Sequence, residues 1–513
     1  MLIRTHSCAL MGVAAIPITI EVNVDMGINF HLVGLPDSAV KESQQRIESA
    51  LKSNGYKMPG KKVVINMAPA DIRKEGSAYD LPIAIGILIA SEQIRANVNA
   101  DDYYITGELS LDGTLQPVRG ALPIALEAKK RGKRGVILPV QNAREAAIVD
   151  GIEILGVENL RQVILFFDEH EAIEPTVINT QEEFKKKLNE YEFDFSDVKG
   201  QENIKRALEI AAAGGHNAIL IGPPGSGKTM LAKRLPSILP PLTLEEALET
   251  TKIHSVAGKM SRYSTIISVR PFRAPHHTIS DVALVGGGAN PQPGEISLAH
   301  NGVLFLDELP EFKRTVLEVM RQPLEERAVT ISRARYTVDF PASFMFIAAM
   351  NPCPCGNYNH PTLECTCGQV NVQRYLSKIS GPLMDRIDLH VEVVPVSHEE
   401  LASTKPVEKS ASIRQRVVAA REIQRVRFAE SPKTFCNAQM SSKMVRQYCA
   451  IDETGQQMLK AAMDKLGLSA RAFDRILKVA RTIADLDNSE NIELGHLSEA
   501  INFRSLDRDN WGK

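Results

Sequence analysis

The sequence predicts an α/β protein built from several domains, and three observations point to this class. The apolar run Ala218–Ile221 is followed by the glycine-rich segment Gly222–Thr229 and then by residues with helical spacing, which is the pattern of a strand, a loop and a helix. Two further apolar runs, Val303–Leu306 and Phe344–Met350, have the length and composition of buried strands. The final segment, 411–503, is rich in lysine and arginine and predicts helices. We therefore expect a sheet with covering helices, followed by a helical segment.

The composition is that of a soluble globular protein. The 513 residues suffice for roughly two to four domains with their own cores. A formal net charge of −2 predicts no general attraction to nucleic acid or membrane, so any polyanion site has to be a local patch. No apolar run approaches the ~20 residues of a membrane span, and Leu81–Ala90 is predicted to be a buried element. Seven cysteines, four of them clustered, fit a reducing compartment, so we expect a cytoplasmic protein without a membrane partner.

The first 168 residues are predicted to form a separate α/β domain. Strands are expected at Ile18–Val24 and Lys62–Asn66, and an amphipathic helix at Ser38–Ser53. Residues 107–118 predict a hairpin that turns at an Asp-Gly pair. From 169 to 195 the composition shifts to Glu, Lys, Asp and Thr, which indicates a linker.

The glycine-rich segment matches the phosphate-binding motif GxxxxGK[ST] without departure. Its glycines allow backbone N–H groups to converge on phosphate oxygens, and the helix that follows adds partial positive charge. Lys228 is expected to reach the β- and γ-phosphates, and Thr229 to give an oxygen to Mg²⁺. A flexible glycine turn would explain neither the lysine nor the flanking strand and helix. The sequence therefore predicts binding of ATP or GTP by Gly222, Pro223, Pro224, Gly225, Ser226, Gly227, Lys228 and Thr229.

Polar residues follow the other two strands. Asp307 and Glu308 end the run that begins at Val303. Asp307 is expected to hold the magnesium shell, and Glu308 to polarise the attacking water. Asn351 follows the next strand, where an uncharged amide can orient that water. Apolar strands often end in acids, and Asn351-Pro352 alone would be a plain turn, so the prediction depends on the combination with the phosphate loop.

Four cysteines lie close together in a segment rich in Pro, Gly and Asn. Cys353, Cys355, Cys365 and Cys367 supply the four thiolates that tetrahedral zinc requires. Such a segment cannot pack its own core, so a cross-link is needed to order it. The C-x-C spacing is tighter than the usual C-x₂-C, and His360 is a possible substitute ligand. Reduced free thiols and a redox disulfide are the alternatives.

The N-terminal region resembles a known protease family. The segments Lys74-Glu-Gly-Ser-Ala-Tyr-Asp80 and Gly107-Glu-Leu…Gly113…Pro117…Gly120 look like the proteolytic domain of the Lon family. At the positions of that family's serine nucleophile and lysine stand Ala78 and Leu122. A serine hydroxyl without a base is a poor nucleophile, so the neighbouring Ser77 does not restore the site. We expect a Lon-protease-like α+β domain over residues 1–168 that cuts no peptide bond.

The remainder resembles AAA+ ATPases of the magnesium-chelatase and MCM branch. The segments Phe272-Arg-Ala-Pro-His-His-Thr-Ile-Ser280, Gly294-Glu-Ile-Ser-Leu-Ala-His-Asn-Gly302 and Asn351-Pro-Cys-Pro-Cys-Gly356 match the YifB/ComM family. With the Lon-like domain in front, the resemblance covers essentially the whole chain. It implies a P-loop AAA+ α/β core over residues 196–400, with a Cys-rich loop at 353–367, and a C-terminal helical lid over 401–513.

This resemblance also implies roles for two arginines. In ring ATPases an arginine at the position of Arg386 reaches the neighbouring subunit's γ-phosphate and neutralises transition-state charge. An ion pair with Asp385 or Asp388 is the alternative. Arg471, at the start of a lid helix, is expected to contact nucleotide in its own subunit.

Basic residues in two insertions are candidates for DNA contact. In MCM-like rings both insertions point into the central channel, where arginines follow a phosphate backbone without reading bases. Residues 328–340 predict the hairpin of the second insertion, beside Glu325 and Glu326, which dilute its charge. The candidates are Arg273, Arg333 and Arg335, with Arg270, Arg327, His276 and His277 nearby.

The implied function is a homohexameric, ATP-driven helicase or translocase that acts on single-stranded or branched DNA. Within the family, ComM itself promotes branch migration during natural transformation. A second hypothesis is a chelatase-type ATPase subunit that remodels a protein partner inserting magnesium into a porphyrin. A third, an ATP-dependent protease, is disfavoured by Ala78 and Leu122.

Overall fold

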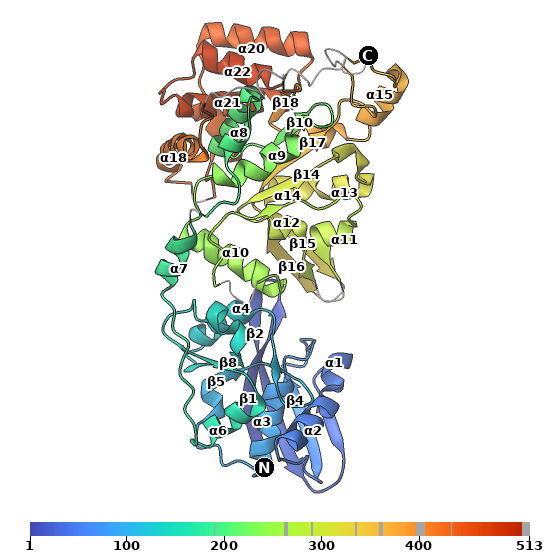
Figure 1. Cartoon of the computed structure of the whole chain (residues 1–513), viewed down its shortest axis with the longest axis vertical. Coiled ribbons are helices and arrows are strands. Elements are labelled where there is room, and N and C mark those ends of the chain that lie inside the picture. Colours follow the sequence, from blue (N-terminus) through green and yellow to red (C-terminus); the bar gives the residue numbers. More distant parts are fainter. Residues whose placement is uncertain are drawn as a thin grey trace.

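The computed structural model describes residues 1–188, 190–260, 265–288, 291–333, 336–358, 363–396, 406–431 and 433–504, and for Lys187, Arg333 and Tyr336 the backbone alone. Two sheets lie one above the other along the long axis of the molecule, and a helical region lies at the far end from the N-terminus (Figure 1). This architecture confirms the prediction of an α/β protein with a helical C-terminal region.

The N-terminal region is built on a seven-stranded mixed sheet with the order β3-β4-β2-β1-β5-β8-β9. The central hairpin pairs β1 with β2 in antiparallel register and turns at Gly12, whose φ of +61° favours glycine. The strands are β1 Leu2–Met11, β2 Ala14–Asp25, β3 Phe30–Val33, β4 Lys62–Ala68, β5 Tyr103–Ile105, β8 Gly135–Pro139 and β9 Glu153–Val157. Its helices are α1 Ser38–Lys41, α2 Ser43–Ser53, α3 Asp80–Ala90, α4 Ala121–Lys130, α5 Val140–Ala146 and α6 Leu160–Phe167.

The apolar run at Leu81–Ala90 forms the buried helix α3. Every residue of α3 is buried, and the helix packs against β1 and β2. This confirms the expectation of a buried element. The expected hairpin at 107–118 is present as β6 Glu108–Leu109 and β7 Leu115–Gln116, whereas the helix expected at 38–53 is divided into α1 and α2.

The middle region carries a second, parallel sheet of five strands in the order β11-β14-β17-β10-β18. The strands are β10 Ala218–Ile221, β11 Phe272–Arg273, β14 Val303–Leu306, β17 Met345–Met350 and β18 Leu389–Glu392. A separate hairpin, β15 Ala328–Arg333 with β16 Tyr336–Pro341, projects from this sheet, and β12 Gly286–Gly287 pairs with β13 Gln292–Pro293. The helices are α8 Glu202–Gly214, α9 Lys228–Arg234, α10 Leu244–Val256, α11 Asp281–Val285, α12 Glu295–Leu298, α13 Arg314–Val319, α14 Arg321–Glu326, α15 Gln369–Leu376 and α16 Gly381–Met384.

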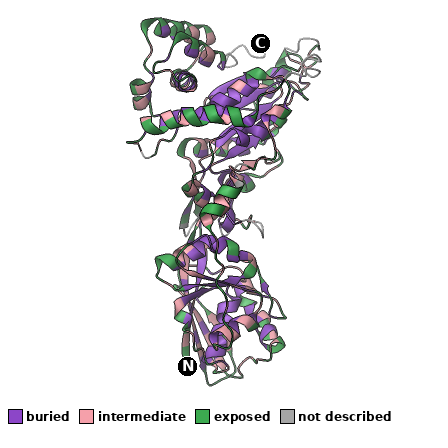
Figure 2. Cartoon of the chain, turned by 60° about the vertical axis from the view of Figure 1, so that its left-hand side comes forward, coloured by how far each residue is buried: buried purple, intermediate pink, exposed green. Residues whose placement is uncertain are grey.

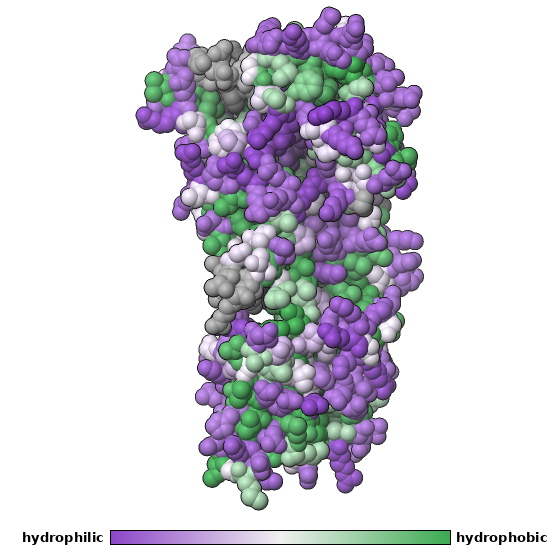
Figure 3. Space-filling view, turned by 180° about the vertical axis from the view of Figure 1, so that it is seen from behind, coloured by the Kyte–Doolittle hydropathy of each residue, from purple (hydrophilic) through white to green (hydrophobic). Residues whose placement is uncertain are grey.

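The C-terminal region is helical and packs on the second sheet through α8. Its helices are α18 Ser410–Arg427, α19 Ser442–Tyr448, α20 Glu453–Leu466, α21 Ala470–Leu486 and α22 Leu494–Asn502. Apolar residues of α8, β10 and β18 share one hydrophobic core with residues of α18 and α21. Figure 2 shows the buried strands inside and exposed helix faces outside, and Figure 3 shows hydrophilic side chains over most of one face. Within the described ranges, no helix combines the length and the apolar character needed to cross a membrane.

The N-terminal region contacts the second sheet's region at two places. At the first, the N–H of Gly120 donates to the carbonyl of Ser255 at 3.1 Å, and the Ser255 hydroxyl donates to the buried carboxyl group of Glu145. At the second, the turn of the β1–β2 hairpin meets β16, where a Cβ added to Gly12 would lie 2.7 Å from Val338 Cγ1. Between residues 169 and 195, helix α7 Thr180–Lys187 packs Phe184 against the core that contains α4 and α5.

Candidate functional site

The glycine-rich segment lies between β10 and α9, at the carboxyl edge of the parallel sheet. Ligands of such sheets bind outside the carboxyl ends of the strands. Gly225 and Gly227 have φ values of +75° and +87°, which turn the loop toward the start of α9. Gly222 has to be glycine for another reason, because a Cβ there would lie 2.3 Å from the carbonyl oxygen of Val393. The loop is therefore fixed against the residue that follows β18.

The Lys228 side chain is held inside the loop. Its Nζ donates to the carbonyl oxygens of Gly222 and Pro223, each at 2.7 Å, and lies 3.4 Å from Asn351 Oδ1. Burial lowers the pKa of Lys228 to about 8, although the nearby Asp307 carboxylate raises it. A phosphate group bound at this position would favour the charged form. Lys228 and Asn351, predicted separately, thus lie side by side.

The two predicted magnesium ligands also lie together. The Thr229 hydroxyl donates to Asp307 Oδ2 at 2.5 Å, so both oxygens converge on one point beside the loop. This donor set fits Mg²⁺, which prefers a hydroxyl and a carboxylate oxygen in addition to water and phosphate. Glu308 follows Asp307 with a φ of +52°, in the left-handed region that is uncommon for residues other than glycine. Its side chain is 57% exposed, and its Oε2 lies 3.2 Å from Nδ1 of His277.

Arg386 lies at the other edge of the same sheet. It precedes β18, and its carbonyl accepts a hydrogen bond from Asn217, the residue that precedes β10. A strand of four residues separates this edge from the phosphate loop by about 13 Å. The Arg386 guanidinium is buried and pairs with Glu325 of α14, instead of the expected alternatives Asp385 or Asp388. Within one subunit Arg386 therefore lies away from the nucleotide edge.

Arg471 also lies away from the phosphate loop. Its guanidinium is 3.9 Å from Asp385, the neighbour of Arg386, and its side chain is 69% exposed. The contact of Arg471 with nucleotide stays a prediction. The sequence indicates that Arg386 and the phosphate loop lie at opposite edges of the sheet. Arg386 and Asp388 precede their strand, whereas the phosphate-loop residues follow theirs. Arg475 pairs with the buried Asp388.

The cysteine cluster is assembled by the loop after β17. The four Sγ atoms of Cys353, Cys355, Cys365 and Cys367 lie within 4.8 Å of one another. Three of the distances between them are 3.4, 3.7 and 3.7 Å. Tetrahedral Zn–S bonds of about 2.3 Å place neighbouring sulfurs about 3.8 Å apart, so the donor set fits zinc.

Backbone N–H groups donate hydrogen bonds to two of these sulfurs. The N–H of Tyr358 donates to Cys353 Sγ at 3.3 Å, and that of Cys355 to Cys367 Sγ at 3.2 Å. Burial opposes ionisation of Cys355, but hydrogen bonds from backbone amides and neighbouring thiols outweigh it and lower its pKa to about 6. Burial and the hydrogen bond with Cys355 raise the pKa of Cys353 to about 12. The group is able to hold a metal ion. His360, considered as a substitute ligand, lies outside the described residues.

The predicted DNA-contacting arginines are only partly described. Arg273 makes hydrogen bonds of 2.6 and 2.8 Å to the carboxylate of Glu295, so its charge is already compensated. Arg270 likewise forms an ion pair, with Glu246. Arg333 is described by its backbone alone, at the end of β15, and Arg335 lies outside the described residues. The contact of these two arginines with DNA remains a prediction.

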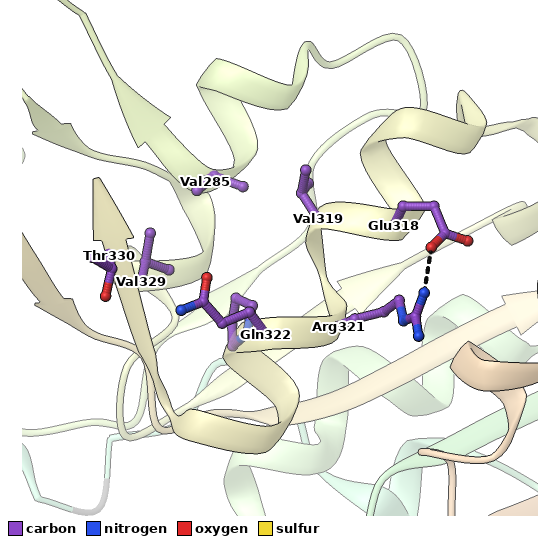
Figure 4. A pocket seen from close by; sticks show the side chains of 8 residues that line it. Val285, Glu318, Val319, Arg321, Gln322, Val329 and Thr330 are labelled. Atoms are coloured by element: carbon purple, nitrogen blue, oxygen red, sulfur yellow. Dashed lines mark hydrogen bonds and ion pairs between the residues drawn. The ribbon is translucent and has the colours of Figure 1, made fainter. Parts of the chain in front are cut away.

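An open cavity of about 490 Å³ lies between the two insertions and not at the phosphate loop. Figure 4 shows Val285 at the end of α11, Val319 of α13 and Val329 of β15 around it. The pair Glu318–Arg321, at 2.9 Å, forms part of its rim. The cavity therefore marks the place where the α11 segment and the β15–β16 hairpin meet.

In the N-terminal region, the positions of the Lon family's catalytic groups carry other contacts. Leu122 is buried, and its N–H donates to Glu145 at 3.0 Å. The hydroxyl of Ser77 donates to the carboxylate of Glu108. The Lys74 side chain is buried and donates to the carbonyl of Pro69. These contacts give Ser77 an acidic neighbour instead of the lysine that a Lon-type site uses.

Comparison with known proteins agrees with this architecture. The family model described as "Magnesium chelatase, subunit ChlI" matches residues 194–401. Those described as "Subunit ChlI of Mg-chelatase" and "Magnesium chelatase, subunit ChlI C-terminal" match residues 20–142 and 407–504.

Three relatives extend the comparison. YifB of Escherichia coli is 46% identical over 508 residues, which cover 98% of this chain and 97% of that protein. The competence protein ComM of Haemophilus influenzae is 45% identical over 505 residues, with 98% and 97% covered. Lon protease 2 of Bacillus subtilis is 31% identical over 129 residues, covering 25% of this chain and 22% of the protease. The chain belongs to the YifB/ComM family of magnesium-chelatase-like AAA+ ATPases, with a Lon-like region in front of the ATPase core.

Proposed function

We propose that this protein is an ATP-hydrolysing motor that assembles into a homohexamer and drives branch migration of DNA. The observation that carries the proposal is the division of the nucleotide machinery between two edges of one sheet. Lys228, Thr229 and Asp307 gather at the carboxyl edge, whereas Arg386 and Arg471 lie near the amino edge. A ring brings the amino edge of one subunit to the carboxyl edge of the next, which completes the site.

The residues of the carboxyl edge support a mechanism for hydrolysis. Lys228 and the loop N–H groups bind the β- and γ-phosphates, while Thr229 and Asp307 would hold Mg²⁺, which supplies charge neutralisation when bound. Glu308 takes a proton from the attacking water, and Asn351 orients that water from the neighbouring strand. The neighbouring subunit's arginine offsets the charge that develops on the transferred phosphoryl group.

The DNA-related part of the proposal rests on the hairpin and on the relatives. One face of the hairpin is polar and exposed. The other face is buried and carries Val329, Ile331, Val338 and Phe340. Arg333, at the end of β15, and Arg335 are the predicted DNA contacts, and they would follow a phosphate backbone. A competence protein is among the relatives that match nearly the full chain.

The cysteine cluster is proposed to bind one structural zinc ion, which would order the loop beside Asn351. Contact between the two sites supports this role, because a Cβ added to Gly356 would lie 2.4 Å from Pro224 of the phosphate loop. All seven cysteines are free thiols, which supports a cytoplasmic location. We assign the motor to residues 196–400 and the lid to residues 401–513.

The proposal is tested by measuring ATP hydrolysis with and without single-stranded and forked DNA. We expect DNA to stimulate hydrolysis, and forked DNA to be converted in the presence of ATP. The variant Glu308→Gln serves as control, because it retains Lys228 and Asp307 and should bind nucleotide while turnover falls by about 10²-fold or more. An ATP hydrolysis rate that is the same with and without either DNA form would contradict the proposal.

The second candidate is a chelatase-type ATPase that remodels a protein partner. The matching family models are named after a magnesium chelatase subunit, which favours this alternative. It predicts ATP hydrolysis stimulated by a protein partner and not by DNA. The same hydrolysis assay therefore separates the two candidates.

A further inference from the structure

We infer that Arg475 of the lid helix α21 is a positioning residue, which holds Arg386, through Asp388, for the active site of the neighbouring subunit. The inference rests on the proposed ring and on the proposed role of Arg386 in it. The place of Arg475 in the sequence, one helical turn after Arg471, gives no sign of such a role. In the structure its guanidinium pairs with the buried carboxylate of Asp388, two residues after Arg386.

The lid contacts residues on both sides of Arg386 in the chain. Each contact joins one residue of the lid to one residue beside Arg386, and the pairs are Arg471 with Asp385, Arg504 with Ile387, Arg475 with Asp388 and Phe503 with His390. The side chains of Arg475 and Asp388 are 24% and 6% exposed. Those of the Arg471–Asp385 pair are 69% and 33% exposed, and their charges lie 3.9 Å apart. Because water and salt screen exposed charges, Arg475–Asp388 is the stronger of these two ion pairs.

The ATPase core holds Asp388 as well. The second oxygen of its carboxylate lies 3.1 Å from Nδ1 of His216 and accepts the N–H of Asn217 at 3.3 Å. Burial opposes ionisation of Asp388, but the charge of Arg475 and the hydrogen bond with His216 outweigh it and lower the pKa of this carboxyl group. Nε2 of His216 lies 2.8 Å from Oγ1 of Thr482 in α21. Asp388 is therefore a charged group fixed between the core and one helix of the lid.

Backbone hydrogen bonds connect Asp388 to Arg386. The N–H of Asp388 donates to the carbonyl of Asn217 at 2.9 Å, and the side-chain amide of Asn217 donates to the carbonyl of Arg386 at 3.1 Å. Oδ1 of Asn217 also accepts the N–H of Phe346, the second residue of β17, at 3.0 Å. Because these bonds form one group, a shift of Asp388 displaces the backbone of Arg386 relative to the sheet.

Arg475 is placed to act on the neighbouring subunit and not on its own nucleotide. Asp388 precedes β18 at the amino edge of the sheet, whereas the phosphate loop follows β10 at the carboxyl edge. These two strands are parallel neighbours, with Ala218 opposite Leu389. A strand of four residues, about 13 Å long, separates the two edges. The proposed ring brings the amino edge to the next subunit's phosphate loop, so loss of Arg475 is expected to affect hydrolysis there.

The test places Arg475→Ala on one chain at a time in mixed rings, which are purified through a different tag on each chain. The reference ring combines Glu308→Gln, which supplies Arg386, with Arg386→Ala, which supplies Glu308. On the Glu308→Gln chain, Arg475→Ala should lower hydrolysis by about tenfold or more, since a misplacement of about 1 Å costs up to ~10²-fold. On the Arg386→Ala chain it should have no effect, because that chain has no arginine left to position. The affinity for ATP should stay unchanged in both rings.

Matched variants control for a general effect of changing the lid. Arg446→Ala removes an exposed arginine from α19 and should leave hydrolysis unchanged on either chain. Arg475→Lys keeps a positive charge beside Asp388 and should retain most of the hydrolysis. Arg475→Gln leaves the buried carboxylate without this charge and should behave like the Ala variant. If the Ala variant does not fold, the comparison of Lys with Gln on the Glu308→Gln chain decides, and equal rates in these two variants would overturn the inference.

The distribution of the loss between the two chains separates the possible roles of Arg475. Equal losses on both chains would show that the substitution damages the subunit as a whole, and they would overturn the inference. A loss on the Arg386→Ala chain alone would show that Arg475 acts on nucleotide in its own subunit, with the same consequence. Full hydrolysis on both chains would also overturn it. A reference ring that recovers no hydrolysis would instead contradict the proposed ring, before Arg475 is changed at all.

Discussion

The division of the site between two sheet edges predicts that two inactive variants restore each other's activity in one ring. Glu308→Gln removes the base but keeps Arg386, whereas Arg386→Ala keeps the base but removes the arginine. Alone, the first should lose turnover by about 10²-fold and the second by about 10³-fold. A strand of four residues, about 13 Å long, separates the sheet edge of Arg386 from that of its own phosphate loop, so we expect its loss to affect hydrolysis in the neighbouring subunit.

The size of the recovery follows from counting interfaces. In the proposed hexamer, an interface is active when an intact Glu308 in one subunit faces an intact Arg386 in the next. In a random equal mixture each condition is met half the time, so about a quarter of the interfaces are active. The mixed rings should therefore hydrolyse ATP at about a quarter of the wild-type rate, roughly 25-fold faster than Glu308→Gln alone.

The assay uses rings that contain both variants. The two chains are co-expressed with different tags and purified through both, and steady-state ATP hydrolysis is measured per ring. A mixture of Glu308→Gln with wild type is the control, and about half of its interfaces should remain active. A mixture of the two variants that is no faster than the mean of its parents would refute the arrangement.

Three further predictions concern the loop lysine, the thiols and the hairpin. The pKa of Lys228 is lowered to about 8 because burial favours the neutral form. The lysine therefore loses its proton as the pH rises past 8, and the affinity for ATP should fall between pH 8 and about 10. Lys228→Arg keeps its charge and should flatten this fall in a fluorescent-nucleotide titration; equal slopes would contradict the assignment. Elemental analysis should find about one zinc per chain, lost in Cys353→Ser with Cys355→Ser, and its absence from freshly reduced protein would exclude a structural metal. Arg333→Ala with Arg335→Ala should keep basal hydrolysis, lose DNA stimulation and make the salt dependence of DNA binding shallower, whereas full stimulation would place DNA elsewhere.

Elements with a strong local pattern were predictable from the sequence. The strand β10, the phosphate loop and the buried helix α3 follow from apolar runs bounded by glycine or an acidic residue. The strand β1 was not predicted, because its buried positions include Thr5 and Ser7 and the apolar alternation fails. The Thr5 hydroxyl donates to the carbonyl of Pro82 at 3.1 Å, so a tertiary contact compensates for burying it.

The candidate site was predictable where one motif contains its residues, and less so where the sheet brings distant segments together. Spacing along the chain orders Asp307, Asn351 and Arg386 but does not say which strands are neighbours. The pair His277–Glu308 depends on β11 lying beside β14, and β11 has only two residues. The ion pair of Arg471 with Asp385 was not predictable, because the path of a lid helix over the sheet has no local sequence signature.

The two contacts attach the N-terminal region to the ATPase core at separate points, and neither uses peptidase chemistry. One contact leaves a domain free to rotate, whereas two separate contacts fix its orientation. Here Ser255 at the end of α10 is held by Glu145, and Val338 of the hairpin is met by the turn at Gly12. The hairpin also shares a core with Phe312, which packs against His277, so packed side chains connect the N-terminal region with the surroundings of Glu308. The Lon-like region thus contacts the hairpin of the ATPase core, although Ala78 and Leu122 stand at the positions of the Lon family's catalytic groups.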